Sequence, residues 1–114
     1  MTRMAVALLF LACVALAAGP ALAEKAPAKP SAAELAKGKM VYDKNCGLCH
    51  NAGVAGALKL GDKEAWKPHL KKGAGHLFES AIKGVGKMPP KGGHPELSEA
   101  DVKAAVVYMV EQSK

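Results

Sequence analysis

The stretch Cys46-Gly47-Leu48-Cys49-His50 governs how the rest of the chain must fold. Cys-x-x-Cys-His is the signature that attaches a c-type haem. Two thiols one helical turn apart can each add to one haem vinyl group as thioethers, and the adjacent histidine is then fixed beneath the iron. We therefore expect Cys46 and Cys49 to hold one covalently attached haem c, and His50 to be the proximal iron ligand.

Two other kinds of site use closely spaced cysteines, and chance spacing is a third explanation. A thioredoxin-like redox pair needs a strand before the motif and a parallel sheet around it, whereas the residues before Cys46 have helical spacing. A zinc site needs two further ligands at close spacing, and the other histidines are scattered, at positions 69, 76 and 94. Haem attachment is the interpretation that the spacing favours.

The second iron ligand should be a soft or borderline donor on a separate segment, and Met88 is the strongest candidate. Pro89 favours an extended backbone at Met88, and Pro90 stiffens the segment further. Glycines at positions 84, 86, 92 and 93 would let the backbone approach a flat cofactor closely. A His/Met ligand pair would raise the reduction potential and leave no iron position for a substrate. That arrangement favours electron transfer over catalysis.

Other methionines and histidines compete with Met88 for the second position. Met40 and Met109 lie on expected helix faces, where filling the core is the better explanation. Ligation by His94 or His76 would give a bis-histidine iron and stays the alternative.

Capping patterns mark the first and last expected helices. Ser31 and Glu34 have the spacing of a capping box, and apolar residues at helical spacing follow as far as Asn45. Ser98 can cap the last helix, along which an apolar stripe runs to the C-terminus.

Two shorter helices are expected between them. One begins at the cap Asp62 and should be bent or interrupted by Pro68. The other covers residues 77–83, between breaks at the glycines 73, 75, 84 and 86. Strand-like alternation is missing from the sequence, so we predict an all-α domain of about four short helices.

The first residues have the pattern of an export signal. Arg3 precedes an apolar run, Met4 to Ala18, which is short for a membrane span and is followed by Gly19-Pro20. Ala21-Leu22-Ala23 fits the cleavage rule for small residues. We expect residues 1–23 to be removed during export to the bacterial periplasm, with an uncleaved anchor as the alternative.

The remaining chain divides into a short tether and one domain. Residues 24–31 are rich in Ala, Pro and Lys and have no apolar periodicity, whereas residues 32–114 can form a single small domain. The chain has 16 basic and 10 acidic residues, and every basic residue except Arg3 is lysine. Scarce arginine and few aromatic residues argue against nucleic acid as a partner. A diffuse lysine field suits the steering of an acidic protein face.

From about Ala33 onward the chain resembles the class I c-type cytochromes, and among them the small bacterial monohaem cytochromes of the c-five type. The segments that carry the similarity are Gly38 and Tyr42, Cys46–His50, Gly53-Val54-Ala55-Gly56, Leu60-Gly61-Asp62, Trp66-x-Pro68, Met88-Pro89-Pro90-Lys91-Gly92 and the helix from Ser98 to Met109. The resemblance implies the class I fold, in which short helices wrap one haem. It also implies that Gly38 and Tyr42 pack the first helix closely against the last, near Ala105 and Tyr108.

The chain departs from the family pattern at two positions near the haem. Leu58 stands where proline is common, and a carbonyl in that region usually accepts a hydrogen bond from the proximal histidine. His69 stands where the family commonly has the arginine that binds a haem propionate.

The resemblance implies a one-electron carrier between redox proteins, and not an enzyme. The alternative is a haem-based gas sensor or a peroxidase-like protein in which Met88 is displaceable. Lys83, Lys87 and Lys91 lie around the ligand segment, where similar cytochromes expose a haem edge, and we expect them to dock acidic faces. Such partners would be oxidases, reductases or other electron-transfer complexes, with membrane contact only through the partner. We expect a monomer.

Overall fold

The structure is a computed structural model that describes residues 29–114. The expected export signal and most of the expected tether lie outside the described residues. The helices are α1 (Ala32–Asn45), α2 (Gly47–His50), α3 (Lys63–Leu70), α4 (Ala74–Lys83) and α5 (Glu99–Ser113), with short 3-10 turns η1 (Val54–Gly56) and η2 (Pro90–Gly93). No strand occurs within this range, and an isolated bridge joins Val85 and Met88. The all-α prediction is confirmed, with α2 as a helix beyond the four expected.

Helices α1 and α5 begin where their capping residues predict. The Ser31 hydroxyl accepts a hydrogen bond from the Glu34 amide, and the Glu34 carboxylate accepts one from the Ser31 amide. The Ser98 hydroxyl likewise accepts from the Asp101 amide at 3.1 Å. Each cap satisfies an amide that has no partner within the helix.

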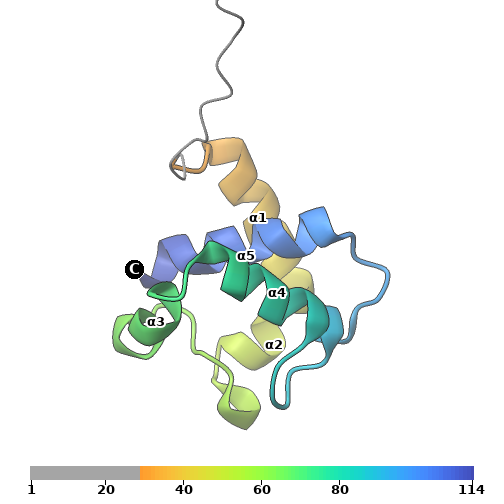
Figure 1. The fold of residues 1–114 in the computed structure, drawn as a ribbon. Helices are drawn as coiled ribbons and strands as arrows, with labels where there is room; N and C mark the ends of the chain where they lie inside the picture. The colour runs from red at the N-terminus through yellow and green to blue at the C-terminus, as the bar shows by residue number, and fades with distance from the viewer. Residues whose placement is uncertain (1–28) are drawn as a thin grey trace, which may run out of the picture.

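Helices α1 and α5 cross (Figure 1), and theirs is the most extensive contact between helices in the described part of the chain. A Cβ atom on Gly38 would lie 2.2 Å from the Ala104 carbonyl oxygen and 2.9 Å from the Tyr108 Cβ. The rings of Tyr42 and Tyr108 lie 5.4 Å apart, centroid to centroid. The close packing of Gly38 and Tyr42 against the last helix is thus confirmed.

The core is formed by apolar side chains from α1, α3, α4 and α5. The buried members are Tyr42, Trp66, Leu77, Ala81, Val102, Ala105, Val106 and Met109. Met109 fills the core as expected, but Met40 is 54% exposed, so that expectation was wrong for Met40. Helix α1 buries the narrow stripe of Gly38 and Tyr42, and Met40 lies two residues from each, on the opposite side of the helix.

The middle helices differ in detail from the sequence expectation. Pro68 lies inside α3, where it has no amide to donate to the Glu64 carbonyl, and α3 ends two residues later, at Leu70. Gly75 was expected to break the chain, but α4 already begins at Ala74 and includes it. Within residues 29–114, no helix has the length and apolar character needed to cross a membrane.

Candidate haem-binding site

The Cys-x-x-Cys-His string lies where α1 turns into α2. The Cys46 amide donates to the Tyr42 carbonyl at 2.8 Å and ends α1, while the Cys46 carbonyl accepts from the His50 amide at 3.1 Å. The two thiols therefore lie one helical turn apart, next to the histidine. Cys46 is partly buried, Cys49 is exposed, and neither forms a disulfide. Burial raises the pKa of the Cys46 thiol, and the neighbouring Cys49 adds to this. This donor set fits covalent haem attachment.

The His50 ring is fixed through one of its two nitrogens. Its Nδ1 lies 2.7 Å from the Leu58 carbonyl oxygen, and because a carbonyl only accepts, Nδ1 carries the proton. This leaves Nε2 as the nitrogen with a lone pair for a metal. Leucine at position 58 thus supplies the carbonyl that the family resemblance implies.

Residues 58–61, which we call the strap, are held at several points beside the histidine. The Leu60 amide donates to the His50 carbonyl at 2.8 Å, and the Trp66 indole donates to the Lys59 carbonyl at 2.9 Å. The Gly61 amide donates to the Ser113 hydroxyl at 2.9 Å. Ser113 is completely buried at the end of α5. Sequence reasoning missed this role, because a serine near the C-terminus carries no local signal of a partner 52 residues away.

Residues 84–93, which we call the ligand loop, present Met88. Val85 and Met88 exchange backbone hydrogen bonds of 3.1 and 2.9 Å, which closes a tight turn. A Cβ atom on Gly84, where φ is +84°, would lie 2.7 Å from the Met88 carbonyl oxygen. Glycine is thus required at position 84 by the loop itself. Met88 is partly buried against the core, on a segment separate from α2.

The competing histidines lie apart from one another. His76 is exposed on α4, His69 is partly buried on α3, and the His94 Nδ1 contacts the Glu96 carboxylate at 2.9 Å. Across the described part of the chain, no three potential metal-binding side chains of the His, Cys, Asp and Glu types come together. A zinc site in this region therefore has no support, and a thioredoxin-like site lacks the sheet that it needs.

The three expected docking lysines have different surroundings. Lys87 is exposed in the Val85–Met88 turn, and within residues 29–114 it forms no ion pair. Lys83 is exposed at the end of α4 and pairs with Glu79 at 2.8 Å. Lys91 is partly buried, and its ammonium donates to the Leu97 carbonyl at 2.6 Å.

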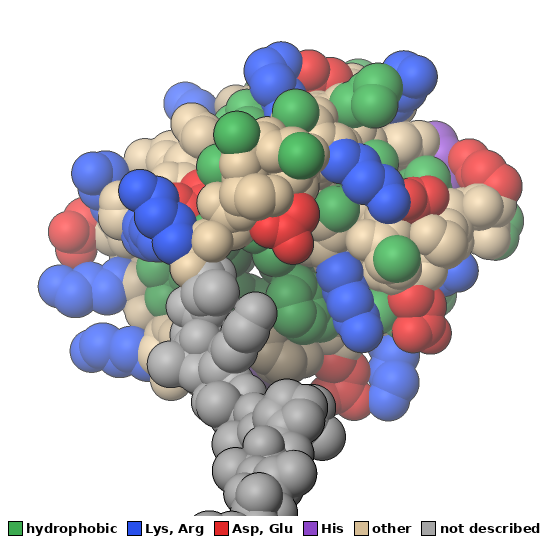
Figure 2. All heavy atoms as spheres, turned by 90° about the horizontal axis from the view of Figure 1, so that it is seen from above, with side chains coloured by type: hydrophobic (Ala, Val, Ile, Leu, Met, Phe, Trp, Pro, Cys, Tyr) green, Lys and Arg blue, Asp and Glu red, His purple; other side chains and the backbone are tan. Residues whose placement is uncertain are grey.

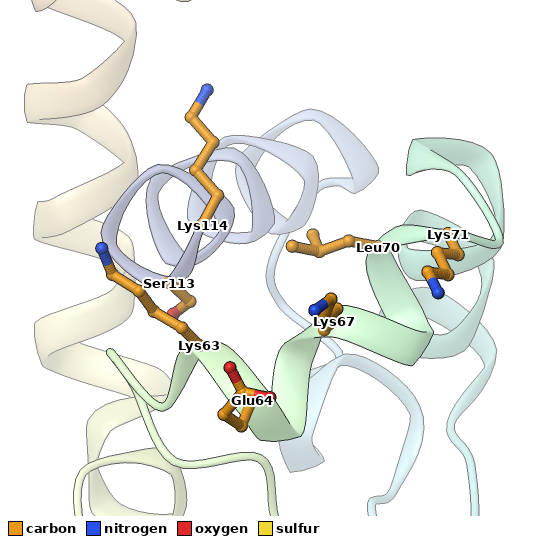
Figure 3. A pocket seen from close by; sticks show the side chains of 7 residues that line it. All are labelled: Lys63, Glu64, Lys67, Leu70, Lys71, Ser113 and Lys114. Atoms are coloured by element: carbon orange, nitrogen blue, oxygen red, sulfur yellow. The ribbon is translucent and has the colours of Figure 1, made fainter.

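A hollow of about 480 Å³ lies elsewhere, between α3 and the end of α5. Its lining residues are Lys63, Glu64, Lys67, Leu70, Lys71, Ser113 and Lys114. The lysine side chains point in different directions (Figure 3), so their ammonium groups do not converge on one ligand. The space-filling view shows lysines and acidic side chains interspersed over another face (Figure 2). Ion pairs at the surface, such as Lys37 with Asp101 at 3.1 Å, contribute little stability.

Comparisons with known proteins show the family to which the chain belongs. Residues 33–109 match the family described as "Cytochrome C oxidase, cbb3-type, subunit III". Cytochrome c-555 of Chlorobaculum thiosulfatiphilum is 49% identical over 85 residues, which cover 71% of this chain and 99% of the relative. Cytochrome c5 of Ectopseudomonas mendocina is 40% identical over 71 residues, or 60% of this chain and 82% of the relative.

A solved structure gives the same result for the fold. It is the cytochrome c in an electron-transfer complex with nitrite reductase, which matches with a TM-score of 0.65 and 46% identity. The match covers 68% of this chain and 95% of that cytochrome. Like these relatives, the chain carries one covalently attached haem c and transfers single electrons. It belongs to the class I c-type cytochromes, as a small monohaem member similar to cytochromes c-555 and c5.

Proposed function

We propose that Cys46 and Cys49 bind the haem through thioethers, that His50 is the proximal iron ligand and that Met88 is the distal ligand. The observation that carries the proposal is the 2.7 Å contact between the His50 Nδ1 and the Leu58 carbonyl. It fixes the ring, sets the tautomer and leaves Nε2 for the iron, on a helix that also presents both thiols.

The bound haem supplies the one-electron change, and the protein sets the conditions for it. The Leu58 carbonyl orients the His50 ring and raises its basicity as a ligand. As an iron ligand, the Met88 thioether would favour the ferrous state and would leave no position for a substrate, which suits electron transfer rather than catalysis. Met88 packs against the apolar core, which holds its side chain among apolar neighbours.

We further infer that partner proteins dock their acidic faces against the lysines near the ligand loop. Lys87 supports this because it is exposed and has no ion pair among residues 29–114. Lys83 can leave Glu79 on encounter, because an exposed pair is weak. Lys91 adds charge, although its ammonium is held by the Leu97 carbonyl. The protein would act as a monomer in the periplasm after removal of residues 1–23, and would serve an oxidase, a reductase or a similar complex.

Haem attachment is tested by mass spectrometry of protein made in a host that matures c-type haem. We expect a polypeptide that starts near Glu24 and carries the mass of one haem through denaturation. Replacing either Cys46 or Cys49 by alanine should weaken or abolish attachment. Full-length unmodified protein without haem would contradict both the attachment and the export proposals.

The distal ligand is tested by Met88→Ala in the holoprotein. We expect an open sixth position and a lower reduction potential, because the thioether that favoured ferrous iron is gone. Met40→Ala removes an exposed methionine and should leave the optical spectrum unchanged. If Met88→Ala kept the low-spin spectrum and the reduction potential of the wild type, and His94→Ala or His76→Ala changed both, the iron would have two histidine ligands and the proposal for Met88 would be wrong. Native activity toward peroxide or a gas ligand with Met88 displaced would favour the sensor or peroxidase alternative.

A further inference from the structure

Lys91 is placed unlike the other lysines near the ligand loop. Its side chain is partly buried, and its ammonium lies 2.6 Å from the Leu97 carbonyl oxygen. By contrast, Lys83 and Lys87 are exposed. Lys91 also has a φ of +54°, a left-handed conformation that residues with a Cβ atom rarely adopt. The fold therefore holds this lysine in a specific and locally unfavourable position.

The contact joins the ligand loop to the beginning of α5. Leu97 packs against the core and directly precedes Ser98, the residue that caps α5. The intervening backbone has short-range bonds, from the His94 amide to the Lys91 carbonyl at 3.2 Å and from the Leu97 amide to the His94 carbonyl at 3.0 Å. The Lys91 side chain spans the same segment, because its ammonium donates to the Leu97 carbonyl. Both the backbone and the side chain of Lys91 therefore hold residues 91–97 together.

An ammonium donor makes this closure stronger than a neutral side chain would. Hydrogen bonds from charged donors are shorter and stronger than bonds between neutral groups. Partial burial of the contact shields it from competing water. Breaking it would leave the Leu97 carbonyl without that donor.

We propose that Lys91 is a positioning residue, whose ammonium fastens the ligand loop to the start of α5 and thereby keeps Met88 in place as the iron ligand. The inference rests on the proposed role of Met88. It assigns Lys91 to the stability of the iron–thioether bond, where sequence reasoning had assigned it to docking.

The inference predicts how readily another ligand displaces Met88. Imidazole can bind the ferric iron only in molecules whose Met88 has moved away, so its apparent affinity depends on the population with an open loop. Loss of the Lys91 contact should raise that population. A tenfold rise in apparent affinity corresponds to about 1.4 kcal/mol, which is close to the lower end of the range for a hydrogen bond to a charged group.

The test compares Lys91→Met with Lys87→Met in the ferric holoprotein. Both variants remove one ammonium from the ligand loop and keep a long apolar side chain, so net charge changes equally. We expect imidazole, titrated optically, to bind Lys91→Met about tenfold more tightly than the wild type, and Lys87→Met within about twofold of it. Lys91→Arg, which keeps a charged donor, should recover most of the wild-type value. Equal affinities for Lys91→Met and Lys87→Met would overturn the inference.

Two further variants make the outcome decisive. If Lys91→Met yields too little holoprotein, Lys91→Gln against Lys87→Gln gives the same comparison, and equal affinities again overturn the inference. Met88→Ala separates this failure from a failure of the proposed function. If Met88→Ala binds imidazole no more tightly than the wild type, then Met88 is not the distal ligand, and the role of Lys91 fails with it. Tight binding by Met88→Ala together with wild-type binding by Lys91→Met would overturn the role of Lys91 alone.

Discussion

Tyr42 connects the end of α1 to the residue that follows the haem-attachment string. Its hydroxyl donates to the Asn51 side-chain oxygen, and its ring is 1% exposed. Burial, followed by the negative charge of ionised Cys46, raises the pKa of Tyr42 to about 12. Thioether formation removes the Cys46 charge, so burial, which is the largest cause, persists in the holoprotein together with the smaller effects of Tyr108 and Asp43.

The raised pKa predicts a loss of stability in alkaline solution. An unfolded tyrosine loses its proton near pH 10, whereas burial makes the folded holoprotein keep this proton to a higher pH. Between these values the unfolded chain binds fewer protons, so the free energy of unfolding falls as pH rises. Tyr42→Phe should lack this component and be less stable than the wild type near neutral pH by about 1 kcal/mol, for the lost hydrogen bond.

The measurement is urea unfolding of both holoproteins over this alkaline range. The lysines titrate in both proteins, so the informative quantity is the difference between the two curves. That difference should shrink as the pH rises. Parallel curves would mean that Tyr42 does not retain its proton in the folded state.

Among the helices, the crossing of α1 and α5 offers a matched pair of glycine substitutions. Gly38→Ala would push a methyl group to within 2.2 Å of the Ala104 carbonyl oxygen, so the helices must separate. We expect it to destabilise the protein by about 3 kcal/mol, the range for overpacking against a rigid neighbour. Gly75 lies inside α4, and a Cβ atom there meets no atom within 4 Å. Gly75→Ala should therefore stabilise the protein by about 0.5 kcal/mol through helix propensity.

Urea unfolding of the two variants checks this expectation, with haem content measured to show that both mature equally. Opposite signs of the two changes are the decisive result. If both variants were destabilised to a similar extent, the flexibility of glycine, rather than the close approach of the helices, would explain why glycine stands at position 38.

The elements differ in how far the sequence alone could predict them. The caps at Ser31 and Ser98 are local, because each side chain binds an amide three residues away, so a single sequence reveals them. The exposure of Met40 could not be inferred, because it depends on how much of α1 the partner helix covers. The hydrogen bonds of Ser113 and Lys91 could not be predicted from the sequence for the same physical reason. Each binds a backbone group whose position only the tertiary fold sets, Gly61 and Leu97 respectively.

For the whole molecule, the charge distribution determines which face meets a redox partner. The chain has a formal net charge of +6, which becomes +5 when Arg3 is removed with residues 1–23. A small carrier with such a charge can be steered toward acidic partners over a Debye length of about 8 Å at physiological salt. Position matters as well as net charge, because electrons must pass near the haem. If Met88 binds the iron as proposed, we expect the exposed Lys87, in the turn that carries Met88, to be the lysine best placed for this role.

We expect Lys87→Glu to slow second-order electron exchange with an acidic partner several-fold at low salt, and Lys83→Glu to add to the effect. Lys91 is left unchanged, because its replacement would also disturb the ligand loop.

Two charge-matched controls are available: Lys29→Glu at the N-terminal end of the described residues, and Lys67→Glu on α3, which lies on the other side of the molecule from the ligand loop (Figure 1). Stopped-flow rates as a function of salt give the measurement. Raising the salt should slow the wild type toward the Lys87→Glu rate, because a weak encounter guided by exposed charges is screened. If the controls slow exchange as much as Lys87→Glu does, net charge alone is responsible and docking does not use the ligand loop.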